Sequence, residues 1–172
     1  MAAKPSYIGQ LNAIANGERG GYELFKAWGD ATKDKSLKPT LDMVAVREME
    51  HSWAFEKRLS ELGFSLRPTT NAALKKQVRY LKSKASDKEK FASFGVGVEK
   101  EQRTGDGTDN LLQLLADKTI DPQTGALIGR FISEERDTGR QLLKAHKAMQ
   151  RRQQAKKLRQ TKKLRETKEA QK

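Results

Sequence analysis

Ionisable residues in an apolar helix seam are the feature that most constrains this chain's fold. In residues 41–62, side chains at steps of three and four form the seam Leu41, Val44, Glu48, His51, Phe55, Leu59 and Leu62. Such steps place side chains on one face of an α-helix. Carboxylates are almost never buried unless they are paired or bind a metal. An inward Glu-x-x-His pair therefore predicts a metal site.

Four successive helical segments each place one glutamate near the middle of such a seam: Glu18, Glu48, Glu101 and Glu135. The first two are 30 residues apart in sequence, and the last two are 34 residues apart. Helices joined by a short turn would bring each pair to a similar height. Four buried carboxylates repel one another strongly unless cations lie between them. Glu99 and Glu134 are alternatives to Glu101 and Glu135 if the helix phase differs slightly.

Turn residues predict where the helices begin and end. The first helix runs from Tyr7 to about residue 33, and its Gly20–Gly21 pair would permit close approach of a neighbouring helix. Gly63 ends the second helix. The connection of residues 64–86 contains a short basic helix around residues 72–83.

Asp87 is the expected cap of a third helix that continues to Leu115, with a kink or turn at Gly105-Asp106-Gly107. Asp121-Pro122 starts a fourth helix. Strand patterns are absent. We therefore expect an all-α chain, with a four-helix bundle in residues 1–145 and one long connection between helices 2 and 3.

Residues 7–145 resemble the ferritin-like superfamily, and most closely the rubrerythrin-type di-iron carboxylate proteins. The segments that carry the resemblance are NGERGGYELF, VAVREMEHSWAF and ISEERDTGRQLL. The resemblance implies a ferritin-like bundle that binds two iron ions, or manganese, and acts as an oxidase, peroxidase or ferroxidase on dioxygen or peroxide. Ferritin-like bundles often dimerise, so a homodimer is also expected.

The resemblance also implies the ligands. Glu18 and Glu101 would be single carboxylate ligands, Glu48 and Glu135 would bridge or chelate, and His51 would supply a nitrogen. The family has a second histidine three residues after Glu135, where this chain has threonine.

That threonine is Thr138. A water molecule or a rearranged Asp137 would fill the missing ligand position, or it would stay empty. The chain has no cysteine, so it lacks the rubredoxin module of rubrerythrin itself. A weaker similarity to demethoxyubiquinone hydroxylases rests on a Gly-Glu-x-Gly stretch in helix 1, on Glu-x-x-His in helix 2 and on Arg67-Pro68-Thr69. That family binds membranes through apolar stretches that this chain lacks.

A metal-free scaffold is the alternative reading of the same residues. In that case Glu48 and His51 would form a buried polar network with an arginine such as Arg19, Arg47 or Arg136. His146, the other histidine, is expected to be exposed at the start of the basic tail.

The positive charge of the chain is concentrated at its C-terminus. Residues 144–172 hold 12 Lys or Arg and 2 Asp or Glu, whereas the other 143 residues hold 23 and 20. We expect residues 146–172 to be a helical or disordered tail. It is either a solvated extension of the fourth helix or an arm for nucleic acid or an acidic partner. The second option gives the alternative function, a metal-free scaffold with a polyanion-binding tail, and DNA-protecting mini-ferritins illustrate a combination of both.

Composition excludes several classes of protein. Without cysteine there are no disulfides, iron–sulfur clusters, Cys-ligated zinc or thiol nucleophile. No apolar run is long enough for a transmembrane helix, and the N-terminus lacks a signal-peptide core. These features predict a soluble, cytoplasmic protein.

Overall fold

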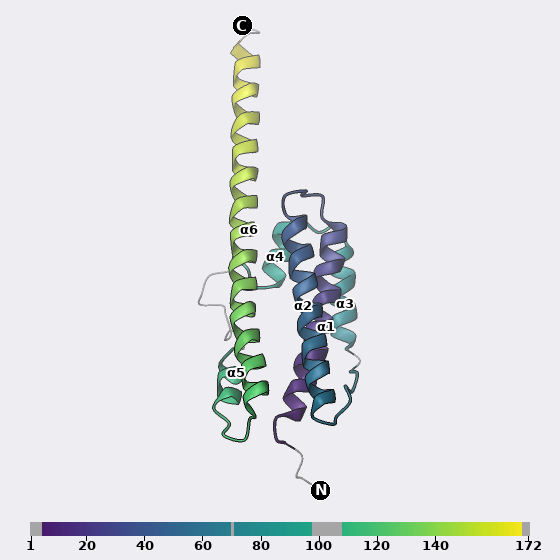
Figure 1. Cartoon of the computed structure of the whole chain (residues 1–172). Coiled ribbons are helices and arrows are strands. Elements are labelled where there is room, and N and C mark those ends of the chain that lie inside the picture. Colours follow the sequence, from purple (N-terminus) through teal and green to yellow (C-terminus); the bar gives the residue numbers. More distant parts are fainter. Residues whose placement is uncertain (1–4, 70, 98–107, 170–172) are drawn as a thin grey trace.

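The computed structural model describes residues 5–69, 71–97 and 108–169, and every regular element within them is an α-helix (Figure 1). The helices are α1 (Ile8–Ala31), α2 (Lys38–Glu61), α3 (Ala72–Lys82), α4 (Asp87–Ser93), α5 (Thr108–Leu115) and α6 (Pro122–Glu169). The predicted all-α class is confirmed. Among the described residues, no helix combines the length and apolarity needed to cross a bilayer.

Helices α1 and α2 form an antiparallel hairpin whose inner faces supply much of the core (Figure 1). One apolar cluster surrounds Trp28 and Val44, and α6 adds Leu142 and Met149 to it. A second cluster surrounds Leu11, where Phe131 of α6 packs. Residues 18 and 48–51 fall between these clusters in sequence, so polar residues occupy a layer between two apolar ones.

The predicted short basic helix is confirmed as α3, which packs along α1. The side chain of Asn71 caps α3 by accepting hydrogen bonds from the N–H groups of Ala73 and Leu74. A Cβ atom at Gly20 would lie 3.3 Å from Leu74 Cδ2, so the glycine does allow α3 to approach closely.

The predicted cap of the next helix is wrong. Ser86 caps α4 in a capping box with Glu89. Asp87 instead accepts hydrogen bonds from Trp28 Nε1 at 2.7 Å and Thr32 Oγ1 at 2.8 Å. Asp87 therefore ties α4 to α1.

The third helix also ends earlier than predicted. Helix α4 ends at Ser93, and Gly95 and Gly97 then adopt φ angles of +68° and +81°. Those angles are strained for residues with a Cβ atom and end the helix. The expected break at residues 105–107 lies outside the described residues.

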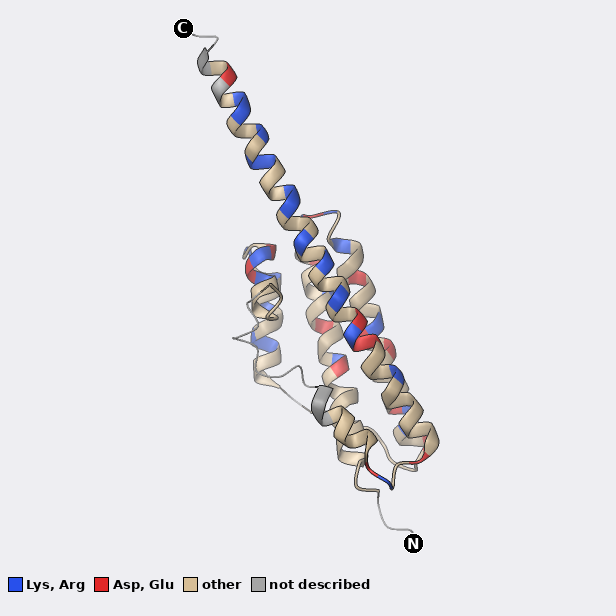
Figure 2. Ribbon diagram, turned by 90° about the vertical axis from the view of Figure 1, so that its left-hand side faces the viewer, with Lys and Arg blue, Asp and Glu red and all other residues tan. Residues whose placement is uncertain are grey.

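Helix α6 begins at Asp121-Pro122, as predicted. Asp121 Oδ1 accepts a hydrogen bond from the N–H of Thr124 at 2.9 Å, and it pairs with Arg58 Nη2 at 2.7 Å. The helix then continues without interruption past residue 146 to Glu169, so the described part of the tail is helical. It projects well beyond the other helices and carries closely spaced Lys and Arg residues (Figures 1 and 2).

Candidate metal centre

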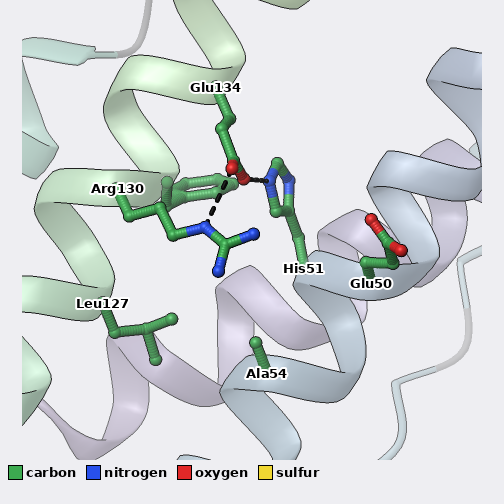
Figure 3. A pocket seen from close by; sticks show the side chains of 7 residues that line it. Glu50, His51, Ala54, Leu127, Arg130 and Glu134 are labelled. Atoms are coloured by element: carbon green, nitrogen blue, oxygen red, sulfur yellow. Dashed lines mark hydrogen bonds and ion pairs between the residues drawn. The ribbon is translucent and has the colours of Figure 1, made fainter.

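His51 of α2 lies at the centre of the polar layer and is 5% exposed. Its Nε2 atom is 2.7 Å from Glu134 Oε2, and Arg130 Nε holds the other oxygen of Glu134 at 2.8 Å (Figure 3). The His51 ring also packs edge-on against Phe131, with ring centroids 5.0 Å apart. These contacts fix the orientation of the imidazole.

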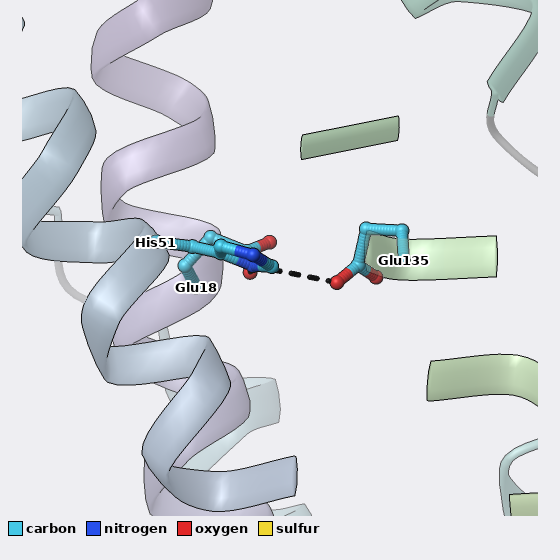
Figure 4. Close-up of side chains that lie close together, drawn as sticks. All are labelled: Glu18, His51 and Glu135. Carbon is cyan, nitrogen blue, oxygen red and sulfur yellow. Dashed lines mark hydrogen bonds and ion pairs between the residues drawn. The ribbon is translucent and has the colours of Figure 1, made fainter. Parts of the chain in front are cut away.

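The other ring nitrogen of His51 faces two further carboxylates. Its Nδ1 atom is 3.1 Å from Glu18 Oε2 and 3.5 Å from Glu135 Oε1 (Figure 4). One ligand atom from each of Glu18, His51 and Glu135 lies within 4.8 Å of the others. Helices α1, α2 and α6 therefore bring together three of the five predicted ligands at a spacing that suits one metal ion.

Glu134 and Glu135, the two alternative glutamates on α6, both contact His51. Glu135 faces Nδ1 of His51, and Glu134 binds Nε2. Histidines that bind metals usually donate their second ring N–H to a carboxylate or carbonyl, which orients the ring. Glu134 is thus placed to orient the ring while Glu135 faces the candidate metal position.

Glu48, the fourth predicted residue in this layer, is 6% exposed and interacts with Glu18. A Cβ atom at Gly21 would overlap the Glu48 carboxylate, so the glycine on α1 makes room for that side chain. Burial, together with repulsion from Glu18 and Glu135, raises the pKa of Glu48 to about 9. Without a cation, this carboxyl group retains its proton at neutral pH.

The histidine is also protonated in this state. Burial alone would lower the pKa of His51, but the neighbouring Glu135, Glu18 and Glu134 carboxylates together raise it to about 10. Burial raises the pKa of Glu18, and its hydrogen bond with His51 opposes that rise. Protons thus supply the positive charge that a metal ion would supply in the same place.

One oxygen of the cluster has no hydrogen bond. Glu135 Oε1 is buried and lies in an ion pair 3.5 Å from His51 Nδ1, but it has no hydrogen-bond partner among the residues that the structure describes. Buried polar atoms are rarely left in this state. A cation between Glu135, Glu18 and His51 would satisfy this oxygen, and mixed carboxylate and imidazole ligands suit iron or manganese. The residues therefore fit a metal ion.

Position 138, where the resemblance to rubrerythrin-type proteins implies a second histidine, holds a threonine. Thr138 is buried and accepts a hydrogen bond from Arg47 Nη1 at 3.0 Å. The same nitrogen pairs with Asp137 Oδ2 at 3.1 Å, so Asp137 is not free to serve as a replacement ligand. Glu101 and its alternative Glu99 lie outside the described residues.

A pocket of about 210 Å³ leads to His51 from the surface (Figure 3). It is lined by Glu50, His51, Ala54, Leu127, Arg130, Phe131 and Glu134. The Arg130 side chain is 72% exposed and stands beside Glu134. A small molecule can therefore approach the histidine through a half-apolar, half-charged opening.

The expectation that His146 is exposed is wrong. It is 5% exposed, packs against Phe91 with ring centroids 4.9 Å apart, and lies beside Gly97. Burial, with a smaller effect from Lys88, lowers the pKa of His146. The inward face of α6 extends past it to Met149, and the spacing of Leu142, His146 and Met149 is a sequence signal from which the burial could have been predicted.

No protein-family model, curated protein or solved structure matches this chain.

Proposed function

We propose that this chain is a ferritin-like metalloprotein that binds iron, or manganese, at Glu18, His51 and Glu135. It would use the metal in oxidation chemistry with dioxygen or peroxide. The observation that supports this most is the convergence of ligand atoms from Glu18, His51 and Glu135 on three helices, where Glu135 Oε1 has no hydrogen-bond partner among the described residues. A bound metal ion would supply a redox-active centre with open positions for a small oxidant.

The surrounding residues have distinct roles in this proposal. Glu134 keeps the His51 ring turned so that Nδ1 faces the metal position. Glu48 lies next to Glu18 and would become a ligand after losing its proton. The proposed two-ion form needs Glu48 together with Glu101. It would hold the second ion less firmly, because Thr138 stands in place of a histidine ligand and its hydroxyl accepts a hydrogen bond from Arg47.

The fold fits this proposal in part. Helices α1, α2 and α6 would be three members of a ferritin-like bundle, and α4 and α5 would take the place of the fourth. The pocket beside His51 would admit dioxygen or peroxide.

The test is elemental analysis of the protein after anaerobic loading with ferrous iron and removal of free metal. We expect about one to two irons per chain, with clear loss of iron in Glu18→Gln and Glu135→Gln variants. Glu23→Gln is the matched control, because Glu23 is an exposed glutamate on the same helix as Glu18. It should retain the iron content of the unmodified protein.

A metal-free polar network is the competing explanation. It predicts that the protein retains no metal and that Glu48→Gln raises the melting temperature, since the amide needs no proton to be neutral. That pair of results would contradict the proposal.

A further inference from the structure

Helix α6 carries a long stretch of positive charge, in which Arg140, Arg152 and Lys162 pair with carboxylates that lie outside the stretch. Residues 138–165 contain 11 Lys or Arg and no Asp or Glu. The whole stretch lies within this one helix, and residues 151–164 are all exposed (Figure 2). Such a density of one sign is unfavourable in isolation and attracts a polyanion.

The cationic surface begins on the body of the protein, before the projecting part. Arg140, Lys144, Lys147 and Arg151 follow steps of four, three and four, which place them on one face of α6. Together with Leu143 and Ala148 they line a shallow hollow of about 370 Å³. A row of cations thus leads from the body into the tail.

Beyond residue 151 the charge lies mainly on one broad face of the helix. Lys156, Arg159 and Lys163 follow steps of three and four and share that face, and Lys157 lies about 100° away from Lys156 around the axis. Leu158 and Leu164 are 72% and 63% exposed and do not form an apolar stripe. Helices that bind a membrane surface need one apolar face, so a bilayer does not fit this segment.

We propose that the cationic surface of α6 binds double-stranded DNA through its phosphates, independently of base sequence. The major groove of B-DNA admits an α-helix and has phosphates on both walls, so the cations on either flank of the projecting segment can contact phosphates. The row on the body would contact the flanking backbone. From Arg140 to Lys163 the helix spans about 36 Å, roughly one turn of B-DNA.

Other nucleic acids fit less well. The major groove of A-form RNA is too deep and narrow for side chains to read, so the helix cannot enter it. Proteins that prefer single strands stack bases on aromatic rings, and residues 138–165 contain no Phe, Tyr or Trp. Double-stranded DNA is therefore the partner that this charge pattern favours.

The test is the fluorescence anisotropy of a labelled DNA duplex of about 30 base pairs titrated with the full chain at several salt concentrations. We expect a plot of log affinity against log salt with a slope of about −5 or steeper, because each phosphate contact contributes about −0.9. Changing Lys156, Lys157, Lys162 and Lys163 together to Gln should make that slope less steep by up to about 3.6. Glutamine keeps nearly the same helix propensity as lysine.

A second four-lysine variant provides the control. Lys75, Lys76, Lys82 and Lys84 are exposed lysines in and after α3, and changing them to Gln removes the same net charge. This control should bind DNA like the unmodified chain. Equal weakening by both variants, or tighter binding to duplex RNA or to phosphatidylserine vesicles than to DNA, would overturn the proposal.

Discussion

At the residue scale, the buried cluster links stability to protons. In the metal-free protein the pKa values of Glu48 and His51 are about 9 and about 10, above their ordinary values of 4.5 and 6.5. A raised pKa means that the folded state binds more protons than the unfolded state between the two values. The stabilisation is therefore complete at low pH and is lost as pH rises.

We therefore expect the unfolding free energy of the metal-free protein to fall between pH 6.5 and pH 9. Each coupled proton contributes a slope of up to about 1.4 kcal/mol per pH unit. Glu48→Gln should remove about half of this slope, because His51 remains. Urea denaturation with a chelator at several pH values measures it, and a flat profile would show that the cluster does not hold these protons.

A second residue-scale prediction concerns Gly21, which makes room for Glu48. Alanine favours the helix by about 1 kcal/mol over glycine, but a Cβ at position 21 would displace the Glu48 carboxylate. Gly21→Ala should therefore weaken metal binding. Gly17→Ala, where a Cβ meets nothing within 4 Å, should stabilise the fold without changing metal affinity. Thermal denaturation and metal titration of both variants separate the two effects, and equal metal affinities would argue against a role for Glu48.

Residue spacing predicted part of the site and missed part of it. Seam periodicity indicated that Glu18, His51 and Glu135 face inward, and the structure places them together. Periodicity could not predict that adjacent Glu134 also reaches His51, because that contact depends on how α6 is rotated against α2. The hydrogen bond from Arg47 to Thr138 was equally unpredictable, because the two residues are 91 positions apart in sequence.

At the element scale, Asp121 fixes the start of α6 and holds it against α2. It caps the helix through Thr124, pairs with the buried Arg58, and accepts a hydrogen bond from the Tyr7 hydroxyl at 2.9 Å. Burial would raise the pKa of Asp121, but the hydrogen bonds from Thr124, Arg58 and Tyr7 hold it well below its usual range.

Asp121→Ala should lower the unfolding free energy by about 2–3 kcal/mol, since it removes the cap and leaves Arg58 with one carboxylate fewer. Asp121→Asn should cost less, because the amide can still cap the helix. Chemical denaturation at pH 7 measures both variants. Because the pKa is lowered, Asp121 stabilises the fold above its ordinary value of 3.8, and this contribution should fade as pH falls below it. Equal losses in the two variants at pH 7 would show that the cap contributes little.

The start of α6 and the extent of α1 and α2 were predictable, whereas the end of the third helix was not. Asp121-Pro122 is a strong local start, and the apolar spacing of α1 and α2 persists over many turns. The third helix was overestimated because the apolar line through Phe91 and Phe94 continues past the true end. The glycines at 95 and 97 outweigh that line by adopting positive φ angles.

At the scale of the whole molecule, one helix carries two proposed functions. Glu134 and Glu135 belong to the candidate metal centre, and the cationic surface starts one to two turns later on α6. Charge on the tail is far from the buried cluster in sequence, and the intervening helix is anchored by Leu142, His146 and Met149. We expect the two activities to be separable by mutation.

Metal binding should stabilise the whole chain, because its ligands come from α1, α2 and α6. A ligand that binds only the folded state at about 100 times its dissociation constant adds about 2.7 kcal/mol, which raises the melting temperature of a chain this size by about 5–10 °C. Calorimetry with and without ferrous iron should show this shift in the unmodified chain and in the Gln variant of Lys156, Lys157, Lys162 and Lys163. Glu135→Gln should lose the shift but keep its affinity for DNA. Loss of both properties in either variant would mean that the centre and the cationic surface depend on each other.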